Sequence, residues 1–571
     1  MRLLLQEYLL LLKEDNELDV VTLELATAMG LTIVSAPQKG VRQDGVDIHA
    51  IGVDPEDGIK KNFLITIKKG DIDRAVWDVS KQGVRSSLNE IIDVYIPNKI
   101  SVEDRKLPSK IILCCGGELK QEVQTNWTGY QNNHSTVQFD LWNASKLSSL
   151  IEENLLNEGV FLESTKKKMR RCLVVLSDHE YDLAHYKETL NDLLFGDDWK
   201  DLAAGAVEKR ALKVLSTISV CLGMIYEYSK DADDFKHPLI AAEHTLLRCW
   251  DFILKNNLQD NTKVTAKFYH LLHLYYKYGA DYFIKIEPHL LVRDGASISC
   301  GSHVLASEVV FQQIGIISIL GLSQAIWAIS AEDPQGIENS KIVLNGLKNL
   351  ISNNGISGSP CFDGMTIDIT LAITFLALCG ENDFIKNWIN EIIRRFHFSY
   401  VVLERGFPIS QDSIEMLVEF EKEKEHTKEK MTSMSTLLAT LAYFCAVLDF
   451  EDQYNDLVKF VEDDLSHCNL QIWFPAKGIK AQLYSRYAGV EFGIAEAPIH
   501  LPKTLSELKD RLVQFSDFSN KSENFETDWK DSPPALPLIA SRHFRTPVIP
   551  FFWLNFKKED LKGVSEKGEA P

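Results

Sequence analysis

The stretch that decides the fold is GVRQDGVDIHAIGVDPEDGIKKNFLITIKKGDI, residues 40–72. It predicts two strands, Gly45 to Val53 and Asn62 to Lys68, joined by the turn signal DPEDG at 54–58. Side chains alternate between the two faces of a strand, so a hairpin of these strands would gather four polar side chains on one face. They are Asp47, His49, Thr66 and Lys68.

An acid and an amine brought together at a sheet edge suit metal-assisted hydrolysis of a phosphodiester bond. The carboxylate would hold Mg²⁺, a hard cation that prefers oxygen ligands. The cation neutralises phosphate charge and activates a water, while the lysine orients that water or stabilises the developing anion.

Further elements follow on both sides of the hairpin. The sequence predicts helices at 18–29, 72–96, 118–130 and 144–156, and strands at 31–36, 110–115 and 136–142. The order within residues 1–156 is therefore α-β-β-β-α-β-α-β-α. Such alternation predicts a mixed sheet with helices on its faces.

Most of the remaining chain has the apolar periodicity of helices. Residues 157–171 contain KKKMRR and are predicted to be a basic linker. Residues 172–556 are predicted to form a helical array or bundle that senses a signal, oligomerises or binds a partner. Residues 557–571 are predicted to be a flexible tail.

Composition limits the class of protein. The 571 residues carry 61 Lys and Arg against 81 Asp and Glu, a net charge of −20, which excludes a generic polycation that coats nucleic acid. None of the ten cysteines lies in a CxxC motif, which favours a reduced, cytoplasmic protein. The start lacks the cleavage site of a signal peptide. Residues 309–331 carry no charge, and their interspersed Gln and Ser residues favour a buried helix over a membrane span.

Residues 1–156 resemble the PD-(D/E)xK restriction-endonuclease-like superfamily, in particular its Mrr-like branch. The similarity rests on the opening helix, GVDI at 45–48, TIK at 66–68, the helix after it, and KIILCCGGELKQEV at 110–123. The resemblance implies an αβββαβ core. It also implies that Asp47 binds the metal and Lys68 is the catalytic lysine, with Glu24 as an assisting acid of the opening helix and the Ile67 carbonyl as a further metal ligand.

One position departs from the family pattern. The family has Glu, Asp or Gln where this chain has Thr66, and a hydroxyl is a weaker ligand than a carboxylate. Either Glu24 or His49 compensates at the metal, or the domain is a catalytically inactive relative.

A local basic cluster lies beside this motif. Seven basic residues outnumber three acidic ones within 60–85, and apart from Lys68 they form a candidate phosphate-contact surface. These residues are Lys60, Lys61, Lys69, Arg74, Lys81 and Arg85.

The sequence thus predicts a cytoplasmic endonuclease that cleaves DNA with Mg²⁺ or Mn²⁺, acts as an oligomer, and serves in restriction or anti-phage defence. No P-loop is present, so any ATPase or sensor function would come from a partner protein. The alternative is an inactive nuclease-like domain on a helical scaffold that binds nucleic acid or a partner protein.

Overall fold

The computed structural model describes residues 2–37, 43–79, 83–156, 162–178, 180–200, 202, 204–410, 427–485, 493–495, 499–529 and 532–550. The chain divides into two compact units, Met1–Leu274 and Tyr275–Pro571. The predicted tail at 557–571 lies outside the described residues.

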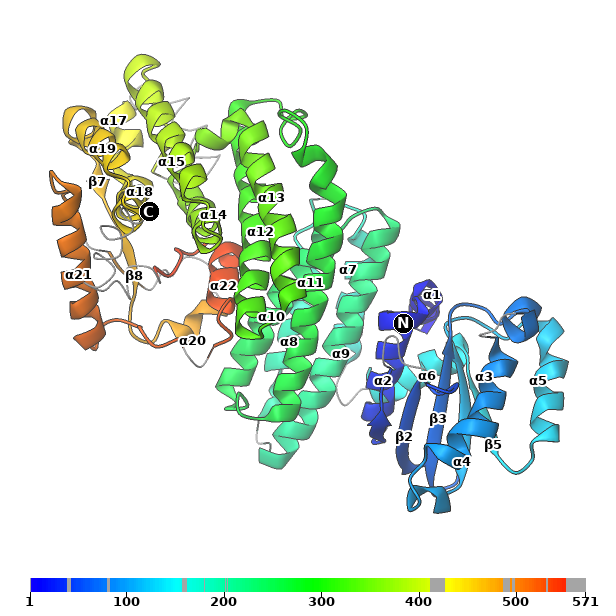
Figure 1. Cartoon of the computed structure of the whole chain (residues 1–571). Helices are drawn as coiled ribbons and strands as arrows, with labels where there is room; N and C mark the ends of the chain where they lie inside the picture. The colour runs from blue at the N-terminus through cyan, green and yellow to red at the C-terminus, as the bar shows by residue number, and fades with distance from the viewer. Residues whose placement is uncertain are drawn as a thin grey trace, which may run out of the picture. The chain divides into compact units, whose positions relative to one another are not determined.

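A five-stranded mixed sheet forms the centre of the N-terminal part of the first unit (Figure 1). Its strands are, in spatial order, β1 (Thr32–Ser35), β2 (Ile48–Val53), β3 (Lys60–Lys68), β4 (Ser109–Cys115) and β5 (Gln138–Trp142). The first three pair antiparallel, and β3, β4 and β5 pair parallel. The prediction of a mixed sheet followed by a mainly helical region is confirmed.

Helices cover both faces of this sheet (Figure 1). On one face, Leu64 and Leu113 pack in an apolar core with Trp77, Leu88 and Trp127. The helices of this face are α3 (Val84–Glu90) and α5 (Gln121–Asn133). On the other face lie α2 (Asp19–Ala28) and α6 (Ala144–Asn154), and the Thr22 hydroxyl of α2 is 3.4 Å from the Cys114 thiol of β4.

Two helical predictions for this part are wrong in detail. The single helix predicted over 72–96 is divided into η2 (Ala75–Val79), α3, η3 (Ile91–Tyr95) and α4 (Ile96–Asn98), with residues 80–82 outside the described part. Gly83 has extended backbone and precedes α3, so a new helix begins there. The helix α1 (Arg2–Leu11) was not predicted, and it buries Leu5, Tyr8 and Leu9.

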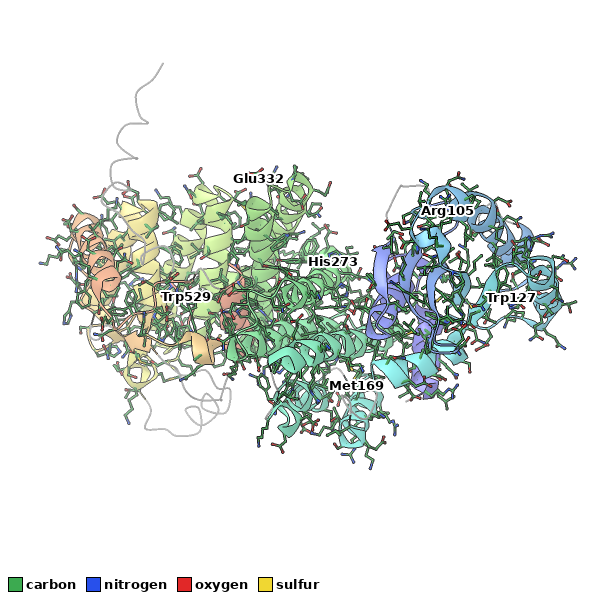
Figure 2. The ribbon with its side chains drawn as sticks, turned by 90° about the horizontal axis from the view of Figure 1, so that it is seen from below. Arg105, Trp127, Met169, His273, Glu332 and Trp529 are labelled. Atoms are coloured by element: carbon green, nitrogen blue, oxygen red, sulfur yellow. The ribbon has the colours of Figure 1, made fainter. Side chains whose placement is uncertain are left out.

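The rest of the first unit consists of long helices. They are α7 (Glu163–Val175), α8 (Ala184–Phe195), α9 (Ala204–Asp231), α10 (Lys236–Lys255) and the first part of α11 (Thr262–Leu290). Residues 163–171 of the predicted basic linker lie in α7. Met169, labelled in Figure 2, is fully buried there, and Lys168 pairs with Asp192 of α8 at 2.8 Å. The predicted linker is therefore helical from Glu163 onward.

The second unit is mainly helical. Its principal helices are α12 (His303–Ser330), α13 (Pro334–Asn353), α14 (Thr366–Leu378), α15 (Asn382–His397), α18 (Leu437–Leu448), α19 (Glu451–Asp464), α21 (Leu505–Lys521) and α22 (Leu536–Phe544). Its described residues also include the last part of α11, two short helices, α17 (Lys428–Met431) and α20 (Lys480–Leu483), the short helical turns η6 (Gly355–Gly358), η7 (Asp363–Met365) and η8 (Phe398–Val402), and four short strands. The strands are β6 (Met434–Ser435), β7 (Asn469–Leu470), β8 (Trp473–Pro475) and β9 (Gly493–Ala495).

Among the residues that the structure describes, two helices, Gly205–Asp231 and His303–Ser330, are long and apolar enough to cross a membrane by length and composition alone. Their most apolar windows are 78% and 72% buried within the protein, as the core helices of a folded unit are.

Candidate functional site

A bulge sets the position of Asp47. Its backbone N–H donates to the Ile65 carbonyl at 2.9 Å, although Ile65 is the residue that pairs with Ile48. Asp47, which immediately precedes β2, and Ile48 therefore both lie opposite Ile65, and we call this bulge-like departure from regular pairing the bulge. The bulge shifts the alternation of side chains, so Val46 packs in the core that contains Leu64. Asp47 points to the opposite side of the sheet.

The carboxylate of Asp47 is held at the end of β3. Its Oδ2 accepts a hydrogen bond from the backbone N–H of Ile67 at 2.7 Å. The pKa of Asp47 is raised to about 6, chiefly by burial and also by the negative charges of Glu14 and Asp19, against the lowering effects of the Ile67 N–H and Lys68. Glu14, Asp19 and Lys68 thus all act electrostatically on the carboxyl group of Asp47.

Lys68 joins this group from the last position of β3. Its Nζ donates to Glu14 Oε1 at 3.0 Å, and the Lys68 side chain is only 12% exposed. The structure therefore brings together Asp47 and Lys68, as the sequence predicted, together with Glu14 and Asp19, which it did not. Both additional acids belong to the stretch EDNELD, residues 14–19, which follows α1 and ends at the first residue of α2. This acidic run between two apolar segments was the available signal.

Thr66 and His49 are not part of this group. Thr66 lies on the same face of β3 as Leu64, and its hydroxyl is buried with no hydrogen-bond partner among the described residues. His49 is buried, its Nε2 is 3.0 Å from Asn62 Oδ1, and its ring packs edge-on against Tyr95. The expectation that all four polar side chains share one face of the sheet is wrong, because the bulge turns Asp47 to the face opposite that of His49 and Thr66.

Glu24 also lies elsewhere. It is buried on α2, and its Oε2 accepts hydrogen bonds from Ser216 Oγ of α9 at 2.5 Å and from Lys267 Nζ of α11. The acid that the resemblance assigns to the metal therefore connects the sheet region to the long helices of the first unit. In the position near Lys68 the structure has Glu14 instead.

The predicted phosphate-contact residues separate into two groups. Lys61 is 2% exposed and donates to Asp54 at 2.8 Å, to Gln138 at 2.5 Å and to Asp57, so it is engaged within the protein. Four others are exposed, namely Lys60, Lys69, Arg74 and Arg85, of which Arg85 pairs with Asp78 at 3.4 Å. Lys81 lies outside the described residues.

The donor set around Asp47 has the chemistry of a hard-cation site. Carboxylate oxygens are the ligands that Mg²⁺ prefers, and Asp47 and Glu14 supply them. Within the described ranges, however, no three His, Cys, Asp or Glu side chains lie close enough together to hold a metal ion by themselves. Any cation bound here would need water or substrate oxygens to complete its coordination.

Family models, curated proteins and solved structures were each compared with the chain, and none of them matches it. The function is therefore argued from the site.

Proposed function

We propose that residues 1–156 form a restriction-endonuclease-like domain that hydrolyses DNA phosphodiester bonds with Mg²⁺ or Mn²⁺. The observation that carries the proposal is the convergence of Asp47, Lys68 and Glu14 from three separate segments at one end of the sheet. The strand order and the mixed pairing support it, because they match the element order of that superfamily. A role in restriction or anti-phage defence rests on the same resemblance.

Asp47 and Glu14 would hold the divalent cation, which when bound supplies charge neutralisation at the phosphate and a water of lowered pKa. The Ile67 N–H holds one oxygen of Asp47, and the other oxygen would bind the cation. Lys68 has three N–H donors and donates to Glu14, so it would hold a phosphate oxygen or stabilise the developing anion. The exposed Lys60, Lys69, Arg74 and Arg85 would contact the DNA backbone.

One observation favours a second candidate, an inactive nuclease-like domain that only binds nucleic acid or a partner protein. The side chain at position 66, which is acidic or Gln in the family, is here a hydroxyl that faces the apolar core. A site with two carboxylates and no third ligand binds a cation more weakly than a complete set does.

Cleavage of supercoiled plasmid and of single-stranded circular DNA by the full chain tests the proposal, with Mg²⁺, Mn²⁺ or EDTA. We expect metal-dependent cleavage that falls by roughly a hundredfold in Asp47→Asn and in Lys68→Gln, since each group acts in the transition state. Matched controls are Asp93→Asn and Lys106→Gln, two exposed residues of the same domain. Full activity in either site variant contradicts the proposal. DNA binding without any cleavage supports the second candidate.

A further inference from the structure

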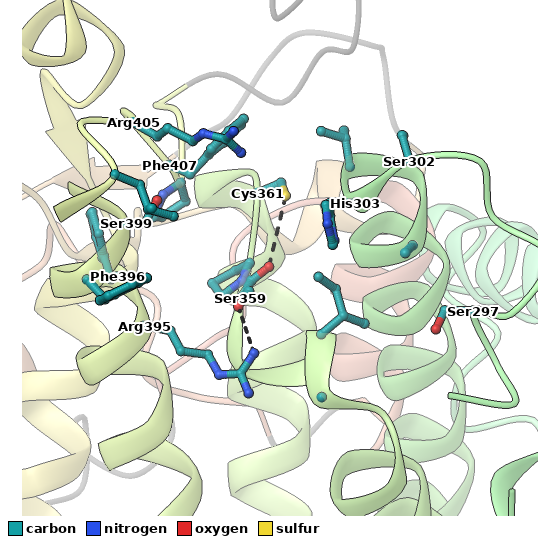
Figure 3. Close-up of a pocket in the computed structure, with 18 of the residues that line it drawn as sticks. Ser297, Ser302, His303, Ser359, Cys361, Arg395, Phe396, Ser399, Arg405 and Phe407 are labelled. Carbon is teal, nitrogen blue, oxygen red and sulfur yellow. Dashed lines mark hydrogen bonds between the residues drawn. The ribbon is translucent and has the colours of Figure 1, made fainter. Parts of the chain in front are cut away.

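A cavity of about 1040 Å³ lies within the second unit, in a part of the chain to which the proposed nuclease assigns no role (Figure 3). Its walls come from three segments, namely residues 294–306 with the N-terminal turn of α12, residues 355–361 before α14, and the end of α15 with the loop to Pro408. The volume is at the upper end of the range of ligand sites, about 300–1,000 Å³. It can accommodate a ligand larger than a single small anion.

The walls are held in place by the fold. The Ile409 N–H donates to the Cys361 carbonyl and the Asp363 N–H donates to the Ile409 carbonyl, both at 2.9 Å, so two of the walls are paired as strands are. The Trp388 indole N–H donates to the Ser357 carbonyl at 3.0 Å and fixes the 355–361 segment on α15. The cavity is therefore preformed.

The lining has more basic than acidic side chains, although the whole chain is acidic. Arg394, Arg395, Arg405 and His303 line the cavity against one acid, Asp294. Figure 3 shows Arg395 and Arg405 on one side of the cavity and His303 on the other. A cavity with this excess of guanidinium groups selects an anion, and arginine matches the geometry of phosphate oxygens in particular.

The arginines differ in whether an acidic side chain of the protein already pairs with them. Glu391 pairs with both Arg394 and Arg395, and Arg395 Nη1 also donates to Ser359 Oγ at 3.3 Å. Arg405 is exposed, and the described part of the chain gives it no ion pair. Arg405 is thus the guanidinium with most of its hydrogen-bonding capacity left for a ligand.

The first turn of α12 adds backbone donors. Ser302 caps this 28-residue helix by accepting from the Leu305 N–H at 3.2 Å. The N–H groups of His303 and Val304 have no acceptor within the helix, because they belong to its first turn, and both residues line the cavity. The helix dipole favours negative charge at the same place.

The cavity also presents aromatic surface. Phe398 is 50% exposed, and it lines the cavity together with Phe407, which is partly buried. An exposed phenyl ring next to an arginine cluster offers a stacking surface for a planar base, an interaction that is tolerant of base identity. A ligand that carries both phosphate groups and a planar base would use both features of this preformed cavity.

We propose that this cavity binds a nucleoside di- or triphosphate, with the phosphates on Arg405, Arg395 and the first turn of α12, and the base against Phe398. The proposal concerns binding only and includes no chemical step on the nucleotide. It does not depend on the nuclease proposal, since its residues lie in the other unit.

Fluorescence anisotropy of the full chain with mant-ATP and mant-GTP tests the proposal, with unlabelled ATP, inorganic tripolyphosphate and adenosine as competitors. We expect saturable micromolar binding of at least one labelled nucleotide. Arg405→Gln should weaken it at least tenfold, through loss of a charge-assisted contact, and Arg405→Lys should weaken it less. Phe398→Ala should weaken it severalfold. Lys459→Gln and Phe518→Ala change matched exposed residues of the same unit and should have no effect.

Three results would overturn the proposal. They are no binding of either labelled nucleotide below millimolar concentration, unchanged binding in Arg405→Gln, and tripolyphosphate competing as well as ATP while Phe398→Ala has no effect. The last result would indicate an anion site that does not recognise a base. Asp47→Asn should bind the nucleotide normally, so failure of DNA cleavage and failure of nucleotide binding are distinguishable.

Discussion

Replacing Glu24 by glutamine should destabilise the first unit without removing a group of the proposed nuclease site. Glu24 is 7% exposed, and its partners Ser216 and the Lys267 side chain are 4% and 17% exposed. Breaking one side of a buried ion pair costs about 3–5 kcal/mol, because the remaining charge loses its partner. The Lys267 side chain remains partly exposed to solvent, and the amide oxygen of glutamine still accepts a hydrogen bond. We therefore expect the free energy of unfolding to fall by about 2 kcal/mol.

The measurement is pulse proteolysis of the full chain across a urea series, read through peptides from residues 1–274. Glu103→Gln, at an exposed glutamate of the same unit, is the control and should stay within about 0.5 kcal/mol of the wild type. In a double-mutant cycle, Glu24→Gln combined with Lys267→Met should cost less than the sum of the two single changes. A Glu24→Gln variant as stable as the wild type, or strictly additive losses, would refute the assignment of Glu24 to the interhelical contact.

Two further predictions concern the residues around the proposed metal site. Because the pKa of Asp47 is about 6 in the folded protein against 3.8 for an ordinary aspartate, the folded state binds an extra proton between these values. The stability that the folded state gains by binding this proton is present at low pH and is lost as the pH rises through 6. Asp47→Asn should therefore become more stable relative to wild type between pH 4.5 and 7, reaching about 1–2 kcal/mol in EDTA. Thermal unfolding at each pH checks this, and a difference that does not change with pH contradicts it. Thr66→Val should raise stability by up to about 1 kcal/mol, because it removes a buried hydroxyl that lacks a partner, and a clear loss of stability would mean that the hydroxyl is bonded.

The sheet was predictable from the sequence because its strands are continuous apolar runs with distinct boundaries. KIILCC and NFLITIK are buried on both faces in the structure, and the turn signal at 54–58 forms the turn between β2 and β3. Such runs combine β-branched residues with flanking turn residues, so their identity does not depend on tertiary contacts. The helix α1 was missed although its buried residues Leu5, Tyr8 and Leu9 have the i, i+3 and i+4 spacing of an amphipathic helix.

The members of the site were less predictable, because contacts far apart in the sequence select them. Lys61 and Lys68 are both lysines of β3, and the sequence placed both near the phosphate. In the fold, Lys61 forms ion pairs with Asp54 and Asp57 of the turn before β3. Lys68 instead meets Glu14 at the other end of the strand. Glu24 likewise bonds to Ser216 and Lys267 of the long helices, and no local sequence pattern indicates this contact.

The bulge at Asp47 decides which acids this site contains. In an unbulged hairpin, Asp47 would face the side occupied by His49 and the hydroxyl of Thr66. One extra residue opposite Ile65 turns the carboxylate toward the stretch at 14–19, where Glu14 and Asp19 raise its pKa. The absence of an acid at position 66 is therefore weaker evidence against catalysis than the sequence suggests. With the bulge in place, a side chain at 66 would not reach a cation bound by Asp47. Under the proposed function, the second carboxylate at the cation is instead that of Glu14, which comes from a segment outside the short motif on which the resemblance rests.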